Sequence, residues 1–473
     1  MRLMRYFLFL FIVLLYSSTV FSGWNISEQK RKEINDKLDR KKLREKEDFV
    51  VDSSFDMLKE PIGEHVVKDF TIAKVPPTIK MQIIPDMEPQ YFADDDSIGA
   101  WANWGKVTRR DDNRFFFSVG DHRGRDCQIN IYEFNSSFNL IHKVVDVDDV
   151  LGWNGKLYSD GKIHGRMGIM PDGTLWAATH FGVYPDSSWW ANGYRGSWLL
   201  SYNIYTHEAV NWGIPLVGNM LPEFTCDTER GRFFGTGANH TCLLWDTINK
   251  KVRYAGYPPN GWLWWRRASL LDEETGKFWS CDASDTTSFC FISFDPEYNR
   301  FERYELSPPA NHYTGKIKPL RAYTENRAMD GAFYCITMNG SLFRFSPEKP
   351  AVERIGVNWD RGRYTSTMAI DPSGRYIYYM PGGMKMQNAN EYGPLVQFDV
   401  KTGKKKVIVW LVDYYYKQYG YWIGGTYGME ISHDGSFLVI CMNGAFVTRD
   451  GEHGDPYGQP SLFVVTIPEE ERR

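Results

Sequence analysis

The sequence predicts an all-β fold built from repeated four-stranded units, and three observations support this prediction. Aromatic residues make up 16% of the 473 residues and 42 residues are glycine, a composition that favours strands and turns over helical bundles. From Ala100 onward, each unit has an apolar strand, a turn rich in Asp, Pro and Gly, a second and a third strand, and a charged hairpin into a fourth. Seven such units follow one another at roughly 40–60 residues, the period of a propeller blade. We therefore expect a seven-bladed β-propeller.

The repeated units are clearest where the first two strands meet. The stretch HGRMGIMPDGTLWAATH aligns with TSTMAIDPSGRYIYYMPGG and with YGMEISHDGSFLVICMNG, and third and fourth strands are clear in LVQFDVKTGKKKVIVWL. The tetrapeptide LLWD at 243–246 lacks the repeated signatures of a WD-repeat propeller, and no run matches the sialidase box. We assign residues 63–473 to the propeller, with blades that start near residues 101, 161, 221, 262, 318, 364 and 425.

The N-terminus has the pattern of a signal peptide, residues 1–22. Arg2 and Arg5 precede an apolar run, and Val20 and Ser22 suit the positions before a signal-peptidase cut. The run is shorter than the ~20 residues of a membrane span, so we expect export to the periplasm, cell surface or medium, without stable membrane insertion. Residues 23–62 are predicted as a charged spacer or helix, because 28–48 is a dense run of mixed charge.

The seventh unit has only three strands, and its outer edge would be left unpaired. Two strand-like runs before the first blade, 65–75 and 78–84, are not claimed by any unit. We therefore predict that one of them pairs with residues 461–467 as the missing outer strand. Deletion of residues 23–60 should then be tolerated, whereas deletion of 23–90 should not.

Charge and cysteine usage exclude several classes of function. The formal net charge is −4 and no basic stripe is present, which argues against duplex nucleic acid as a partner. As a separate prediction, we expect a monomer. The seven cysteines include no CxxC pair, so zinc-ribbon and thioredoxin-like sites are excluded. Cys281, Cys335 and Cys441 lie in apolar runs and are predicted to be buried. Cys226 and Cys242 could form a disulfide in an oxidising compartment, and the sequence does not decide this.

Two histidines of the second unit are placed to face one funnel. In a propeller blade, the start of the first strand and the end of the second lie on the same face near the central channel. His164 starts a first strand and His180 ends the second strand of the same blade, while His122 and His240 also end second strands. Trp189, Trp190 and Tyr194, in the insertion after His180, could form one wall. The starts of first strands add Arg166, Glu223, Arg266, Arg267, Arg321, Tyr364 and Tyr427.

These residue types suit an anionic polysaccharide. Aromatic faces stack on pyranose rings, and guanidinium groups bind carboxylates with two hydrogen bonds. β-Elimination at a uronic acid needs a cation on the carboxylate, a base for the C5 proton and an acid for the leaving oxygen. Arg can serve as the cation, and His or Tyr as base and acid. Hydrolysis by two carboxylates is less well supported, because only Glu223 and Asp282 stand near the funnel.

The layout over residues 100–467, with GDH in the first unit and KIH followed by DGTLWAATH in the second, resembles the secreted β-propeller polysaccharide lyases, notably ulvan lyases. The resemblance implies a catalytic histidine pair, His164 and His180, with a tyrosine and an arginine, for which we choose Tyr194 and Arg266. It also implies that catalysis requires no cofactor, although a divalent metal could have a structural role. The predicted substrate contacts are Arg166, Arg267, Trp189, Trp190, Tyr364, His122, His240 and Arg321.

Two other functions stay open. One is a non-catalytic carbohydrate-binding or scaffold propeller. The other is a metal-dependent lactonase that resembles the gluconolactonase propellers, with Glu223, Asn339, Asn443 and Asp282 around a divalent cation. Each of the two asparagines precedes a glycine, however, and we predict hairpin turns at 339–340 and 443–444 in preference to metal ligands, because Asn-Gly tolerates positive φ at both positions.

Overall fold

The computed structural model describes nine stretches of the chain. The predicted signal peptide, the charged 28–48 run and His122 lie outside them. The described residues are 49–61, 69–85, 102–121, 127–153, 159–182, 187–191, 193–382, 393–446 and 458–472.

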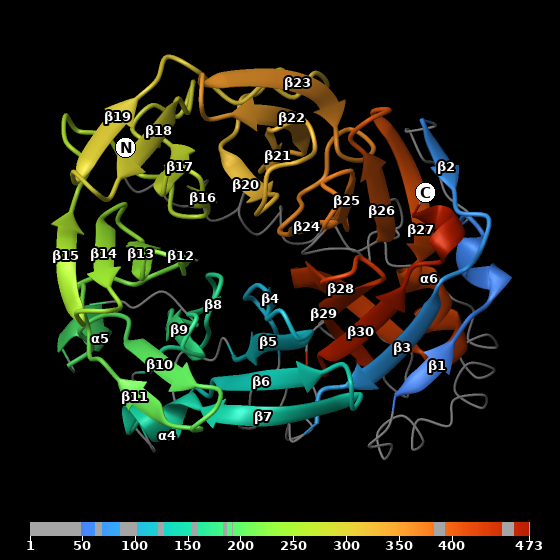
Figure 1. Cartoon of the computed structure of the whole chain (residues 1–473), viewed down its shortest axis with the longest axis horizontal. Helices are drawn as coiled ribbons and strands as arrows, with labels where there is room; N and C mark the ends of the chain where they lie inside the picture. Colours follow the sequence, from blue (N-terminus) through green and yellow to red (C-terminus); the bar gives the residue numbers. More distant parts are fainter. Residues whose placement is uncertain are drawn as a thin grey trace, which may run out of the picture.

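Seven β-sheets form a ring, with the first strand of each sheet nearest the centre (Figure 1). The predicted all-β seven-bladed propeller is therefore confirmed. The first four blades are β4 (Thr108–Arg109), β5 (Arg114–Val119), β6 (Asn130–Asn135) and β7 (Leu140–Asp146); β8 (Gly168–Ile169), β9 (Thr174–Ala178), β10 (Leu199–Asn203) and β11 (Ala209–Asn211); β12 (Glu223–Asp227), β13 (Arg232–Thr236), β14 (Cys242–Asp246) and β15 (Lys251–Gly256); β16 (Leu270–Asp272), β17 (Lys277–Cys281), β18 (Phe291–Asp295) and β19 (Arg300–Arg303).

The last three blades carry the remaining strands, and two of them are widened by strands from the N-terminal region. Short helices are α4 (Val147–Leu151), α5 (Ser187–Ala191), α6 (Leu411–Tyr419), η1 (Phe55–Leu58) and η2 (Glu469–Glu471). No helix in the described stretches is both long enough and apolar enough to cross a membrane. The blades are β20 (Leu320–Tyr323), β21 (Phe333–Thr337), β22 (Ser341–Ser346) and β23 (Ala351–Val357); β24 (Met368–Ile370), β25 (Tyr376–Tyr379), β26 (Pro394–Asp399), β27 (Lys404–Trp410) and β2 (Phe70–Ile72); β28 (Tyr421–Ile431), β29 (Phe437–Phe446), β30 (Ser461–Thr466), β3 (Thr78–Ile83) and β1 (Val50–Asp52).

The hairpin between third and fourth strands has one recurring cause. Several third strands end in Asp or Asn, whose side-chain oxygen accepts a hydrogen bond from the backbone N–H two residues on, as an Asx turn does. Asp246, Asp295 and Asp399 each form this bond, at 3.0, 3.0 and 2.9 Å. Aromatic rings then join neighbouring blades: Phe291 of β18 stacks on Phe345 of β22 with ring centroids 4.4 Å apart. The repeated turn and the aromatic core together explain the period of the sequence.

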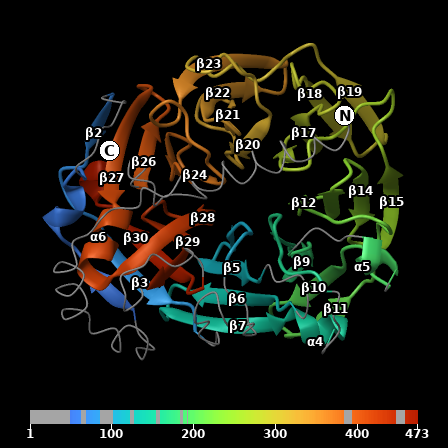
Figure 2. The same cartoon turned by 180° about the vertical axis from the view of Figure 1, so that it is seen from behind.

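The N-terminal region closes the ring, as predicted. β3 pairs antiparallel with β30, from Thr78 opposite Thr466 to Ile83 opposite Ser461, and β1 pairs with the outer edge of β3. The earlier run supplies β2, which pairs in parallel with β27 of the neighbouring blade. Figures 1 and 2 show these blue strands against the red C-terminal strands from both sides. One segment thus ties the two last blades to each other.

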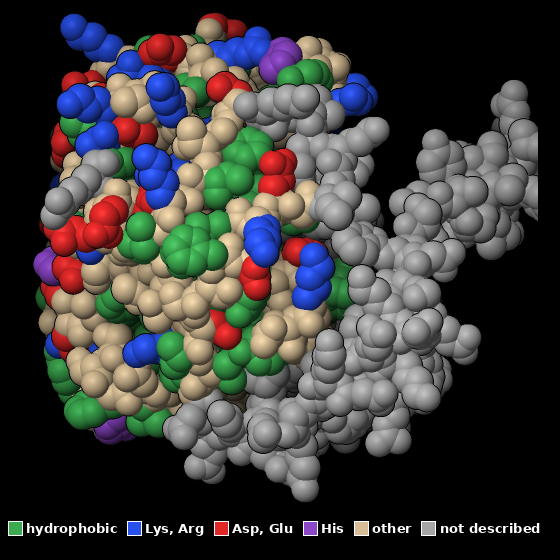
Figure 3. Space-filling model, turned by 90° about the vertical axis from the view of Figure 1, so that its right-hand side faces the viewer, with side chains coloured by type: hydrophobic (Ala, Val, Ile, Leu, Met, Phe, Trp, Pro, Cys, Tyr) green, Lys and Arg blue, Asp and Glu red, His purple; other side chains and the backbone are tan. Residues whose placement is uncertain are grey.

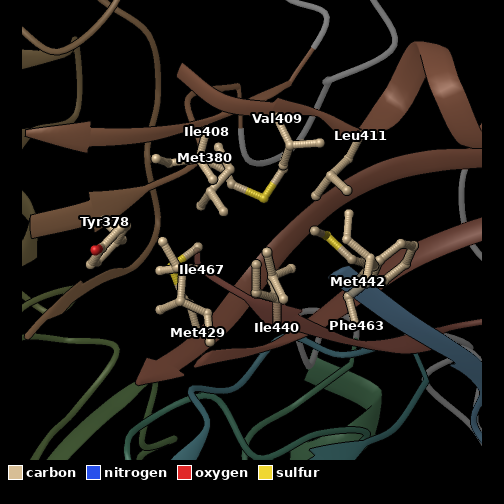
Figure 4. Close-up of a cluster of buried hydrophobic side chains, with 14 of the residues drawn as sticks. Tyr378, Met380, Ile408, Val409, Leu411, Met429, Ile440, Met442, Phe463 and Ile467 are labelled. Carbon is tan, nitrogen blue, oxygen red and sulfur yellow. The ribbon is translucent and has the colours of Figure 1, made fainter. Parts of the chain in front are cut away.

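Part of the segment predicted as charged spacer belongs to the folded ring. Val50–Asp52 forms β1, and Met57 is fully buried with Ile79, Met81 and Phe463. Apolar residues in the stretch FVVDSSFDML explain the difference, because they favour burial more strongly than the preceding charged run. The same core fills the space between the last two blades, where methionine and isoleucine side chains interdigitate (Figure 4).

The surface and the thiols agree with the compositional expectations. On the side that carries β1 and β2, basic and acidic side chains are mixed (Figure 3). All seven cysteines are free thiols, so Cys226 and Cys242 do not form a disulfide. Cys281, Cys335 and Cys441 are completely buried, as predicted.

Candidate functional site

The two histidines of the second blade share one site. Lys162 and His180 form an isolated antiparallel bridge, which brings the start of the first strand beside the end of the second. The rings of His164 and His180 meet edge to face, with centroids 5.9 Å apart, and the residues are only 3% and 1% exposed. Gly120 of the first blade allows the backbone before His164 to approach closely, because a Cβ at Gly120 would lie 2.1 Å from the carbonyl oxygen of Gly161. The predicted histidine pair is therefore present as a buried contact.

His164 is held as a neutral base. Arg267 Nη1 donates a hydrogen bond to His164 Nε2 at 2.9 Å, so the ring proton lies on Nδ1. Nδ1 is buried and has no hydrogen-bond partner among the described residues. Burial, followed by the positive charges of Arg267 and Arg321, holds the pKa of His164 well below its usual value. At neutral pH this imidazole is therefore uncharged and can act as a proton acceptor.

Arg321 occupies the next position around the ring. It is 1% exposed, and its Nη1 donates to the carbonyl oxygen of Ser366 at 3.3 Å, while its Nε donates to the hydroxyl of Tyr364. Its guanidinium carbon lies 5.1 Å from the ring centre of Tyr364 and 5.8 Å from that of Tyr427. Tyr427 also contacts His164, at 6.0 Å between ring centroids. Arginine, histidine and tyrosine thus come from four different blades.

A buried ion pair lies beneath these groups. Glu223 is completely buried, with one carboxylate oxygen 3.6 Å from Lys106 Nζ. Lys106 donates to the hydroxyl of Tyr323 at 3.2 Å, and that hydroxyl donates to the carbonyl oxygen of Ser269. Burial raises the pKa of Glu223, and the charges of Lys106, Arg321 and Arg267 oppose the rise.

We call this assembly the inner cluster. It holds two lysines and two arginines against the carboxylate of Glu223, and the buried carboxyl of Asp160 acts electrostatically on Lys162, so buried positive charge is in excess. Its members are Lys106, Lys162, His164, His180, Glu223, Arg267, Arg321, Tyr364 and Tyr427.

Arg166, predicted as a substrate contact, lies two residues after His164 and directly before Met167 and β8. It forms ion pairs with Glu325 and with Glu430, the second at 2.6 Å. It lines a cavity of about 490 Å³ whose wall includes turn residues between first and second strands, such as Arg110 and Pro171. The same cavity is also lined by Lys106 of the inner cluster, so it reaches from the turn residues to the buried ion pair.

Tyr194, predicted as catalytic, is bonded to a buried aspartate. Its hydroxyl donates to Asp160 Oδ1 at 2.6 Å, and burial followed by the charge of Asp160 raises its pKa well above the usual value. Its ring packs on Trp189 and Trp190 of α5, at 5.6 and 5.0 Å. These two tryptophans therefore form a compact aromatic cluster with Tyr194, and the described structure shows no contact between Tyr194 and His164.

The structure separates the two neighbouring arginines. Arg267 contacts His164, whereas Arg266 Nη1 donates to the carbonyl oxygen of Ala238 at 2.7 Å. Both residues lie in the turn before β16, and of the two only Arg267 has a hydrogen bond to His164 in the described structure. His240 also has a local contact, with Nδ1 2.9 Å from the carbonyl oxygen of Trp264, which makes Nδ1 the donor.

Two members of the site carried a sequence signal that we did not use. Lys162 stands two residues before His164, so both side chains belong to the same face of the extended chain. Asp160 precedes it by two more, and accepts hydrogen bonds from Thr179 and Tyr194, each at 2.6 Å.

The proposed lactonase ligands do not converge. Asp282 is bonded to Arg303 at 3.1 Å, and Asn339 Nδ2 donates to the carbonyl oxygen of Lys316. Asn443 lies inside β29 and bonds both backbone groups of Asn103, so the predicted turn at 443–444 is wrong. The described ranges contain no group of three or more His, Cys, Asp or Glu side chains that could hold a metal ion.

Known proteins resemble this chain in structure at low sequence identity. No protein family matches the sequence, and no curated protein has a significant sequence match. Among solved structures, the chain is similar to the WD40 repeats of RRP9, with 10% identity and a TM-score of 0.47 over 82% of this chain and 97% of that one. It is also similar to a chain of the mitotic checkpoint complex, with 9% identity and a TM-score of 0.48 over 87% and 95%, and to U3-55K, with 9% and 0.48 over 82% and 98%.

Proposed function

We propose that the inner cluster binds a uronate residue of an anionic polysaccharide and cleaves the polymer by β-elimination. One observation carries the proposal: Arg267, Arg321 and His164 converge with two tyrosines in a buried site where positive charge is in excess. Export through the predicted signal peptide, residues 1–22, belongs to the same proposal.

The electrostatics of the inner cluster favour an anionic ligand. Burial lowers the pKa of Arg267, and the charge of Arg321 lowers it further. Such like charges in a low-dielectric site destabilise each other unless an anion joins them. A carboxylate would satisfy the Arg321 Nη2 group, which is buried and has no hydrogen-bond partner among the described residues. Guanidinium groups suit a carboxylate because two parallel hydrogen bonds form at once.

Each step of β-elimination then has a candidate group. Arg267 and Arg321 neutralise the uronate carboxylate, which acidifies the C5 proton. As Arg267 turns its hydrogen bond from His164 Nε2 to the carboxylate, the neutral imidazole takes the C5 proton on the freed Nε2. The electron pair of the C5–H bond forms the C4–C5 double bond as the C4–O bond breaks. Tyr364 or Tyr427 donates a proton to the leaving oxygen. His180 acts as a positioning residue, because its ring lies against that of His164.

A second candidate function is a binding propeller without chemistry. It is favoured by the burial of His164 and Arg321, which are 3% and 1% exposed. Under this alternative, the inner cluster recognises an anionic group and leaves it unchanged.

One experiment separates the two functions. The full chain is incubated with a panel of uronate polysaccharides while the ultraviolet absorbance of the unsaturated sugar product is recorded, and binding is measured by calorimetry. Absorbance that rises supports the lyase, and binding without a rise supports the binding propeller. Arg267→Lys should reduce kcat/KM by about 100-fold because the two-bond contact is lost. The matched control Arg266→Lys should stay within about twofold, as expected for a residue outside the cluster. Equal effects of the two variants would refute carboxylate recognition at Arg267.

A further inference from the structure

Lys162 is a buried amine that the proposed elimination does not use. The residue is 6% exposed, and its Nζ lies 5.3 Å from the ring centre of Trp104 and 5.7 Å from that of Phe181. These rings come from the first and second blades, so the amine sits between two blades. Its backbone forms the bridge to His180 that shapes the site.

These surroundings favour a nucleophilic amine. An ammonium group removed from water and placed near another cation loses its proton more readily, which is how lysines that form imines are activated. Burial, followed by the charge of Arg267, lowers the pKa of Lys162 to about 7, and the charge of Asp160 opposes this shift. A large fraction of the side chain is therefore neutral at neutral pH.

The amine also belongs to the segment that carries His164, the histidine to which Arg267 donates a hydrogen bond. Lys162 and His164 are two residues apart on one extended segment, so their side chains project to the same side. Both side chains feel the charge of Arg267. A ligand with a carboxylate on the arginines would therefore present its neighbouring atoms to the amine.

We propose that Lys162 captures the aldehyde or ketone of a carboxylate-bearing ligand as an imine. The ligand class comprises 2-oxo acids and sugar acids in their open-chain form. This inference rests on the proposed carboxylate site and adds a covalent activity to it.

The chemistry balances without an oxidant or reductant. The neutral amine attacks the carbonyl carbon, the C=O π electrons move to oxygen, and a proton passes from nitrogen to oxygen to give a carbinolamine. The hydroxyl then leaves with a second proton as water, and the nitrogen electron pair forms the C=N bond. His164, which feels the charge of Lys162, and His180, whose backbone is bridged to that of Lys162, can carry these protons. Water reverses the reaction, so capture is reversible.

The test uses glyoxylate, a small aldehyde that bears a carboxylate. The full chain is incubated with glyoxylate and borohydride, which reduces an imine to a stable secondary amine, and labelled peptides are mapped by mass spectrometry. At neutral pH, Lys162 should be labelled at least about tenfold more than exposed Lys401, because an ordinary lysine has a pKa near 10.4. Labelling should increase as pH rises through about 7. Propionaldehyde, which has no carboxylate, should label Lys162 less.

Controls separate this inference from the proposed function. Lys162→Arg keeps the charge and should abolish the label at this position, while Lys401→Met should change nothing at Lys162. If calorimetry detects uronate binding but Lys162 is labelled no more than Lys401, covalent capture is refuted and the carboxylate site stands. If no uronate binds and Lys162 is not labelled, both proposals fail. Equal labelling by propionaldehyde and glyoxylate would refute the stated ligand class.

Discussion

Replacing Arg267 by Met removes the cation that donates to His164 Nε2 at 2.9 Å. Burial is the first cause of the low pKa of His164, and the charges of Arg267 and Arg321 follow. A neighbouring charge typically moves a pKa by about 1–3 units, so we expect Arg267→Met to raise the pKa of His164 by about that amount. The value should approach the ordinary 6.5 without reaching it, because burial and Arg321 persist.

The same shift has a consequence for stability in acid. The unfolded chain binds a proton at His164 as pH falls through 6.5, whereas the folded chain does so only at lower pH. The contribution of His164 is therefore full above pH 6.5 and is lost below it, by about 1.4 kcal/mol per pH unit. In Arg267→Met, this loss of folding stability should span a narrower pH range, because the pKa of His164 in the folded chain lies closer to its value in the unfolded chain. Burial is the main cause that raises the pKa of Asp148 to about 7 and that of Asp160 to about 6. Their contributions to folding stability therefore increase as pH falls, opposite to that of His164, in wild type and in Arg267→Met alike.

The direct measurement is an NMR titration of the histidine rings in the full chain. The His164 signals are assigned by their absence in His164→Gln. Arg266→Met is the control, since Arg266 bonds a backbone carbonyl and does not contact His164 in the described structure. If His164 titrates at the same pH in wild type and in Arg267→Met, the charge coupling within the inner cluster does not exist.

Three further predictions concern stability, measured by chemical denaturation. Met57→Ala should lower the free energy of unfolding by about 2–3 kcal/mol, because the side chain is fully buried, whereas Phe55→Ala, at a residue 68% exposed, should stay within about 0.5 kcal/mol; equal effects would place η1 outside the core. Tyr194→Phe should cost about 1–3 kcal/mol and raise the pKa of Asp160 above about 6, because a buried carboxylate loses a donor; unchanged stability would contradict that contact. Glu471→Ala should cost about 1–3 kcal/mol, because two backbone N–H groups before β3 lose their acceptor; a value near zero would show that this contact does not hold the closure.

The repeat made the fold predictable, because seven units with one turn pattern can bury their faces only against one another. The missing fourth strand of the last unit also predicted the pairing of β3 with β30. The parallel addition of β2 to β27 was not predicted, since an edge strand of three residues leaves no register signal in the sequence. The role of Val50–Asp52 was missed because a charged run stands directly before it.

The site was predictable where strand alternation applies and not elsewhere. His164, His180, Arg321 and Tyr364 belong to first-strand starts or second-strand ends, and they meet as expected. The choice between Arg266 and Arg267 depends on the register of the repeated units to within one residue, and the uneven spacing of the units does not define the register that closely. Tyr194 lies in an insertion without a repeat counterpart, so no periodicity could place it.

The buried charges of the inner cluster cost folding free energy, and the propeller fold does not require them. The other inner positions of a propeller can be filled by apolar side chains, and a buried charge usually contributes less to stability than a well-packed hydrophobic residue of the same size. Arg321 has partners in Tyr364 and Ser366, so removing it would leave buried polar groups unsatisfied. Arg267 instead faces a neutral histidine and a second arginine. Arg267 is thus held against like charge, near the neutral imidazole of His164 and the amine of Lys162. We argue that an anionic ligand explains this arrangement more readily than the stability of the ring does.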